Sequence, residues 1–146
     1  MSWVVHKFGG TSVKDAAMFR RVKDIVDAEA AAAGDRVCVV VSAMSKVTDA
    51  LFELCARAGR PGSSDDDVAA PLAALVERHH ATIDALLAAP AAAALKARID
   101  HDAEGLRHLL RATRVLRSQN REIVEVVDGH GEVWSAQILA ALLGFT

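Results

Sequence analysis

The chain has 146 residues, of which 29 are alanine, and its formal net charge at pH 7 is −2. Because 52% of its residues are apolar and 25% are charged, the composition excludes a disordered chain. The balanced charge gives no electrostatic support for nucleic acid or membrane as partners, and no apolar run reaches the ~20 residues that a membrane span needs, so we expect a soluble, cytoplasmic protein.

Two short segments near the start predict β-strands. Residues 3–8 are rich in β-branched and aromatic side chains and end at a Gly-Gly pair, and residues 36–42 contain a continuous apolar run. A continuous run is typical of a parallel strand that is covered on both faces. We therefore expect Cys38, inside that run, to be a small core residue.

A helix is predicted after each strand, over residues 16–33 and 47–58. Asp15 can cap the first of these helices, and Gly34 occupies a position where helices often end. The order strand, helix, strand, helix makes residues 1–59 a βαβα unit, which belongs in a parallel sheet.

The rest of the chain predicts a surface loop and then helices. Residues 60–67 are rich in turn-forming and acidic side chains, and residues 68–146 form a helical region in which we expect His79 on a solvated face. Two strands are too few for a free-standing sheet, so the expected class is helix-rich α/β with an incomplete parallel sheet, part of a larger domain. The predicted helices of the region cover residues 70–89, 91–116, 120–127 and 132–143.

The first strand ends in a candidate phosphate-binding loop. Lys7 lies at the end of the strand, where open α/β sheets bind ligands, and Gly9 and Gly10 allow backbone N–H groups to approach an anion closely. Thr11 and Ser12 add hydroxyl groups. The loop is not a Walker A motif, in which the lysine follows the glycines. The alternative interpretation is an ordinary tight turn with an exposed lysine.

A second candidate segment, residues 42–49, follows the second strand and therefore lies at the same edge of the sheet. Ser42, Ser45 and Thr48 supply hydroxyl groups, and Lys46 supplies a cation. The alternative interpretation is a helix N-terminus that Ser45 or Thr48 caps, which is the commoner use of such residues.

The third candidate segment is the Gly-His-Gly-Glu-Val-Trp-Ser stretch at residues 129–135. Glu132, near a predicted helix start, could bind the ammonium group of a ligand or could simply favour the positive end of the helix dipole. The segment lacks the H-E-x-x-H zinc signature, and we expect no metal site.

Together, these three segments resemble the aspartate kinases of the amino-acid kinase fold. The resemblance rests on Lys-Phe-Gly-Gly-Thr-Ser-Val at residues 7–13, Val-Val-Ser-Ala-Met-Ser and Val-Thr-Asp within 40–49, and His-Gly-Glu-Val-Trp-Ser-Ala at 130–136. It implies the N-terminal part of a three-layer αβα domain. The stretch at 131–137 is most similar to aspartate kinases that are fused to homoserine dehydrogenase.

The resemblance implies transfer of the γ-phosphoryl group of ATP, with Mg²⁺, to the β-carboxylate of L-aspartate, the first step of lysine, threonine and methionine biosynthesis. It also implies a homo-oligomer. The site residues that it implies are Lys7 as the catalytic residue, Lys7, Gly9, Gly10, Thr11 and Ser12 for ATP, and Ser42, Thr48 and Glu132 for the substrate.

In the resembled family, the nucleotide pocket and the regulatory domains come from later segments. We therefore expect the 146 residues alone to have no kinase activity and to hold no tightly bound cofactor. Two other interpretations stay open from the sequence. One is a kinase of the same fold with a different carboxylate or carbamate acceptor, and the other is a non-catalytic helical module.

Overall fold

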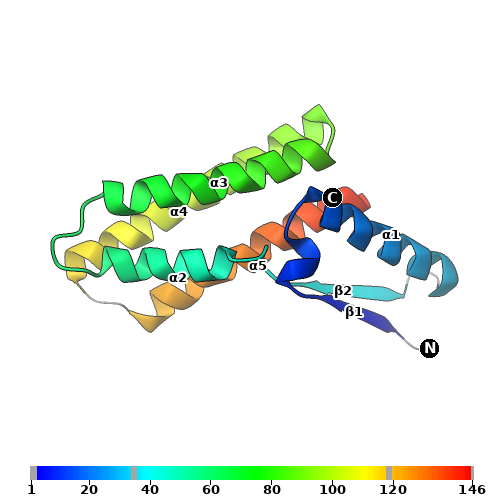
Figure 1. Ribbon diagram of the computed structural model, residues 1–146, viewed down its shortest axis with the longest axis horizontal. Helices are drawn as coiled ribbons and strands as arrows, with labels where there is room; N and C mark the ends of the chain where they lie inside the picture. The colour runs from blue at the N-terminus through cyan, green and yellow to red at the C-terminus, as the bar shows by residue number, and fades with distance from the viewer. Residues whose placement is uncertain (1–2, 34–35, 118–119, 146) are drawn as a thin grey trace.

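A small parallel sheet and a bundle of long helices make up the computed structural model, which describes residues 3–33, 36–117 and 120–145. The sheet and α1 lie at one end, α2, α3 and α4 extend away from them, and α5 runs from the helical end back to the sheet (Figure 1). None of the described helices is long and apolar enough to cross a membrane. The elements in chain order are β1 (Val4–Phe8), the short 3₁₀ helix η1 (Gly10–Val13), α1 (Ala16–Ala33), β2 (Val37–Val41), α2 (Val47–Ala58), α3 (Asp66–Leu86), α4 (Ala89–Leu116) and α5 (Arg121–Leu143).

The two strands pair in parallel, as the βαβα pattern predicts, but only one face of the sheet is covered. Phe8, Val39 and Val41 pack against the core, whereas Val40 keeps 47% of its surface exposed. Cys38 is exposed as well, so the predictions of a strand covered on both faces and of a core cysteine are wrong for this chain. A continuous apolar run indicates that both faces of a strand can be buried, but other parts of the protein must pack on the second face.

The first helices follow the predicted bounds, and local hydrogen bonds explain where they begin. Asp15 caps α1, since its Oδ1 accepts from the Met18 N–H at 3.0 Å, while Gly34 lies outside the described residues. α3 begins at residue 66, earlier than predicted, because Ser64 and Asp67 exchange backbone-to-side-chain hydrogen bonds of 2.7 and 3.3 Å. The Ser64 N–H and the Ser64 hydroxyl group both donate to Asp67 Oδ2, at 2.7 and 2.8 Å, and these two bonds lower the pKa of the Asp67 carboxyl.

α5 is one continuous helix, so the prediction of separate helices over 120–127 and 132–143 is wrong. Asn120 caps its start by accepting from the Glu122 N–H at 2.8 Å, and Gly144, with φ of 82°, ends it. Gly129 and Gly131 lie inside the helix. A glycine in a helix costs only about 1 kcal/mol, which the packing of a long helix can offset.

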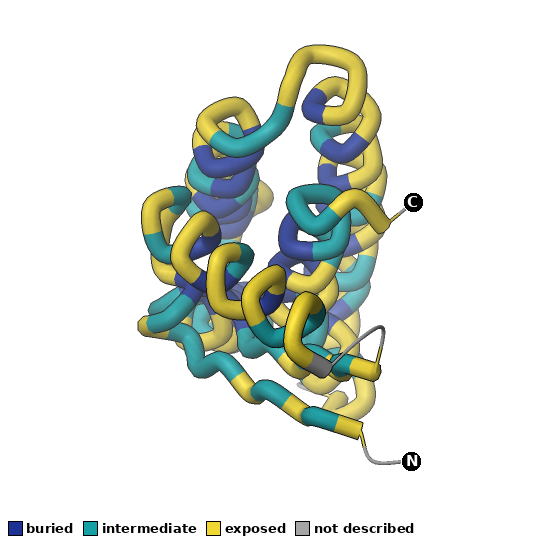
Figure 2. Tube along the Cα trace, turned by 90° about the vertical axis from the view of Figure 1, so that its right-hand side faces the viewer, coloured by how far each residue is buried: buried dark blue, intermediate teal, exposed yellow. Residues whose placement is uncertain are grey.

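The helices pack around a core whose largest buried side chain is Trp134. Buried residues line the sides on which the helices face one another, and exposed residues cover the outside (Figure 2). The Trp134 indole N–H donates to Asp102 Oδ2 at 3.1 Å, and the His79 ring meets the indole edge-on at 4.9 Å. His79 is fully buried, not on a solvated face as predicted, and burial lowers its pKa. The fold therefore holds this imidazole in its neutral form.

Candidate functional site

The three candidate segments meet at one hollow of about 390 Å³ beside the ends of β1 and β2. Chain segments more than 80 residues apart in sequence contribute to its walls. The residues that line it are Gly10 and Thr11 from the first segment, Ser42, Ala43, Met44, Ser45, Lys46, Thr48 and Asp49 from the second, and Glu132 from the third.

Strand pairing brings the first two segments to the same edge. The Ser42 N–H donates to the Phe8 carbonyl at 3.0 Å, which extends the hydrogen bonding between the strands to the last residue of β1 and the first residue after β2. After β1, the Ser12 N–H donates to the Gly9 carbonyl at 2.9 Å and closes a helical turn. The first N–H groups of a helix have no partner within the helix. The start of η1 therefore offers backbone donors beside the hollow, an arrangement that suits an anion.

Two glycines allow the three segments to pack this closely. A Cβ atom on Gly10 would lie 2.9 Å from the Ala43 carbonyl oxygen, and one on Gly131 would lie 2.8 Å from the Ala43 Cβ and 3.2 Å from a Val47 methyl group. The second segment is therefore held between η1 and α5, with Ala43 as the shared contact. Neither glycine has a positive φ, so close approach is the reason for both.

Glu132 reaches the second segment from α5. Its Oε1 accepts from the Ala43 N–H at 3.5 Å, and its side chain is exposed at the hollow. Glu132 lies in the middle of α5, so the interpretation that it complements a helix N-terminus is wrong. One turn earlier, burial and then the nearby charge of Glu132 raise the pKa of Asp128. Of the two carboxyl groups, Glu132 is the one that lines the hollow.

The hydroxyl groups of the second segment do not cap α2. The N-cap is Lys46, which has a left-handed backbone with φ of 70° and makes no side-chain cap. Ser45 and Thr48 therefore do not serve the structural purpose that the alternative interpretation gave them. Lys46 Nζ lies 3.4 Å from Asp49 Oδ2, and both side chains are exposed. This segment thus presents hydroxyl groups and one balanced ion pair to the hollow.

Lys7 lies on the open face of the sheet. It is the residue before the end of β1, pairs in register with Val40, and is exposed. It does not line the hollow, and neither do Gly9 and Ser12. The structure thus gathers Gly10, Thr11, Ser42, Thr48 and Glu132 at one place and leaves Lys7, Gly9 and Ser12 beside it.

Arg78 is a residue of this region that the sequence did not reveal. It projects from α3 and donates from Nη1 to the Ser45 carbonyl at 2.8 Å and from Nη2 to the Lys14 carbonyl at 3.0 Å. Ser45 belongs to the second segment, and Lys14 directly follows η1. A single arginine on an amphipathic helix belongs to no sequence motif, so the sequence alone does not distinguish it from other surface arginines.

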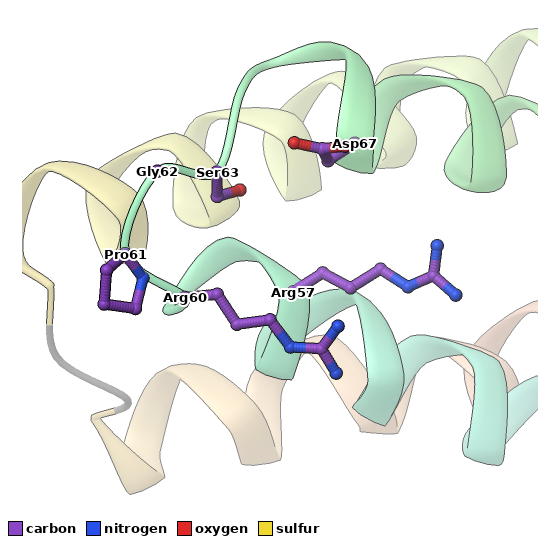
Figure 3. Close-up of a pocket in the computed structure, with 6 residues that line it drawn as sticks. All are labelled: Arg57, Arg60, Pro61, Gly62, Ser63 and Asp67. Atoms are coloured by element: carbon purple, nitrogen blue, oxygen red, sulfur yellow. The ribbon is translucent and has the colours of Figure 1, made fainter.

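A separate hollow of about 240 Å³ lies between the end of α2 and the start of α3 (Figure 3), at the end of the molecule away from the sheet (Figure 1). Arg57 and Arg60 line it, and both donate to Glu53 Oε1 at 3.1 Å. It contains none of the predicted site residues. Their shared carboxylate partner means that these two guanidinium groups already have a local structural role.

The described residues do not form a metal-binding cluster. No three His, Cys, Asp or Glu side chains within residues 3–33, 36–117 and 120–145 are placed to hold a metal ion together. At the hollow itself the carboxylates are those of Asp49 and Glu132, and Lys46 and the Ala43 N–H already engage them. These residues do not fit a resident Mg²⁺ site.

Comparisons with known proteins agree with this geometry. The model of the amino acid kinase family matches residues 2–144. The chain is 40% identical over 142 residues to the protein of Arabidopsis thaliana named bifunctional aspartokinase/homoserine dehydrogenase 1, chloroplastic. That match covers 97% of this chain and 15% of the relative, so the chain spans about a seventh of its length.

Solved structures share the fold. Aspartokinase III of Escherichia coli, in complex with aspartate and ADP, matches with a TM-score of 0.80 and 26% identity over 98% of this chain and 29% of that protein. The same enzyme in complex with lysine and aspartate gives a TM-score of 0.79 over 97% of this chain. The helix-rich α/β class with a two-stranded parallel sheet is therefore confirmed.

Proposed function

The chain belongs to the amino acid kinase family, and we propose that it forms the aspartate-binding side of an aspartokinase active site. The full-length enzyme would transfer the γ-phosphoryl group of ATP to the β-carboxylate of L-aspartate, in the first step of lysine, threonine and methionine biosynthesis. The observation that carries the proposal is the meeting of η1, the segment after β2 and Glu132 at one hollow.

The reaction needs positioning and charge stabilisation more than it needs a protein base. An ionised carboxylate oxygen attacks the γ-phosphorus, a new P–O bond forms, and the bond to the leaving ADP oxygen breaks without a proton transfer. Donors aimed at the transferring group lower the barrier because its charge redistributes in the transition state. Lys7 and the backbone N–H groups at the start of η1 would supply such donors.

The substrate would be held by the other two segments. The Ser42 and Thr48 side chains would donate to a carboxylate of aspartate, and the exposed carboxylate of Glu132 would pair with its α-ammonium group. Mg²⁺ would neutralise the phosphates of bound ATP. Since the residues of this chain do not fit a metal site, we assign no step to a metal held by them.

We also propose that the full-length enzyme is a homo-oligomer and lies in the cytoplasm. Support for association comes from apolar side chains that stay exposed, among them Val5 at 62% on the sheet and Val115 at 70% at the end of α4. The Arabidopsis relative is named as a chloroplastic protein. We also propose that the 146 residues alone are inactive, since they span a small part of such relatives.

An acceptor panel on the full-length enzyme tests the function. ADP release should depend on L-aspartate, and hydroxylamine should trap the acyl phosphate product as a hydroxamate. Glutamate, acetylglutamate and carbamate should give at most background rates. A preferred acceptor other than aspartate would move the chain to another kinase of the fold, and no turnover with any acceptor would favour a non-catalytic module.

A further inference from the structure

We propose that Arg78 is a positioning residue of this active site. It fixes the loop after β1 (residues 9–15, which include η1) and the loop after β2 (residues 42–46) relative to each other. The inference rests on the proposed function, because it assigns Arg78 a part in substrate binding. It concerns α3, a helix that contributes no residue to the lining of the hollow.

The geometry of the two hydrogen bonds carries the inference. Arg78 lies 33 residues after Ser45 and 64 residues after Lys14 in sequence, and its half-buried guanidinium binds the carbonyl groups of both. The guanidinium is planar, and its donors keep a fixed spacing. One rigid group that binds two carbonyl oxygens therefore sets the separation of the two loops.

The loop after β2 needs such external support. Lys46, directly after Ser45, has a left-handed backbone with φ of 70°, which is unfavourable for a residue with a Cβ atom. It caps α2 without a side-chain hydrogen bond. Surrounding contacts must hold a backbone of this kind in place. Arg78 supplies one of them, at the carbonyl group of the preceding residue.

The neighbouring residue on α3 connects the third segment. His79 packs its ring edge-on against Trp134, which lies two residues after Glu132 on α5. Two adjacent residues of one helical turn thus contact the second segment, the third segment and Lys14, which directly follows η1. His79 is part of the core, whereas Arg78 binds only loop backbone, so removal of the arginine should loosen the loops and leave the core packed.

Steady-state kinetics of the full-length enzyme test the proposal. Arg78→Ala should lower kcat/KM by about ten- to a hundredfold, because small misplacements of binding groups have effects of this size. The KM values for both aspartate and ATP should rise, since the two loops serve both ligands. Arg78→Lys should keep part of the activity, because an ammonium group can bind one carbonyl but does not reproduce the fork.

Arg98→Ala is the matched control, since Arg98 is exposed on α4 and forms no hydrogen bond or ion pair within the described part of the chain. It should behave like the wild type. Wild-type KM values in Arg78→Ala, with only a lower melting temperature, would overturn the positioning role and leave a structural one.

Hydrogen exchange gives a readout that does not depend on activity. In Arg78→Ala, and more weakly in Arg78→Lys, backbone amides of residues 10–14 and 42–46 should exchange faster together, while those of the core around Trp134 keep their protection. Unchanged exchange in both loops would overturn the inference even if the enzyme proved to use another substrate. Absence of aspartate-dependent turnover in the wild type would instead overturn the proposed function.

Discussion

Replacing Lys7 with alanine is expected to lower kcat of the full-length enzyme by about 10²–10³-fold, the usual effect of removing one group that stabilises transition-state charge. The fold should be unaffected, because Lys7 is exposed and its ammonium group makes no ion pair in the described residues. KM for aspartate should change little. The measurement is kcat and KM for both substrates, together with the melting temperature.

Lys14→Ala is the control for the Lys7 variant. Lys14 is another exposed lysine, directly after η1, and its Nζ lies 4.0 Å from Asp15 Oδ2 in a solvated pair that contributes little to stability. The alanine variant keeps the backbone carbonyl group that Arg78 binds. This variant should keep wild-type kcat. If the Lys7→Ala variant folded normally and also kept wild-type kcat, Lys7 would not be the catalytic residue.

Gly131→Ala and Gly129→Ala should change stability in opposite directions, although the two glycines lie two residues apart on α5. A Cβ on Gly131 would meet Ala43 and Val47 at 2.8 and 3.2 Å, and overpacking of this kind costs about 1–3 kcal/mol. A Cβ on Gly129 would meet nothing within 4 Å. Alanine there should raise the free energy of unfolding by about 0.5–1 kcal/mol through helix propensity.

Urea unfolding of the 146-residue chain measures both changes. Gly105→Ala on α4 provides a second open position and should also stabilise. In the full-length enzyme, Gly131→Ala should raise KM for aspartate as well, because Ala43 also binds Glu132. Stabilisation by Gly131→Ala would show that α5 does not pack against the second segment as closely as described.

Much of the arrangement of the candidate site could be predicted because short segments carried the information. The glycines after one strand and the hydroxyl groups after the next lie at the same edge of any parallel sheet, whatever the rest of the chain does. Lys7, which lies within β1, is on the open face and does not line the hollow. Glu132 was found through its neighbours in a motif. What the motif could not show is that Glu132 lies in the middle of a long helix and bonds to the Ala43 N–H.

The wrong predictions share a cause: they depend on which element packs against which. Cys38 lies in an apolar run like that of a buried strand, yet no described helix covers its face. His79 is polar and stands beside another histidine, yet Trp134 packs against it. Glycine is unfavourable within a helix, yet Gly131 is the residue that allows α5 to approach Ala43. Local patterns carry propensities, whereas these outcomes follow from tertiary contacts.

The central claim is that Glu132 and the two loops form one aspartate-binding site, and a comparison of aspartate with succinate, which lacks the α-ammonium group, tests it most directly. In full-length Glu132→Gln, KM for aspartate should rise about ten- to a hundredfold, as expected for loss of a hydrogen bond to a charged group. The inhibition constant of succinate and KM for ATP should stay near their wild-type values. An unchanged KM for aspartate, or an equal loss of affinity for succinate, would contradict the account.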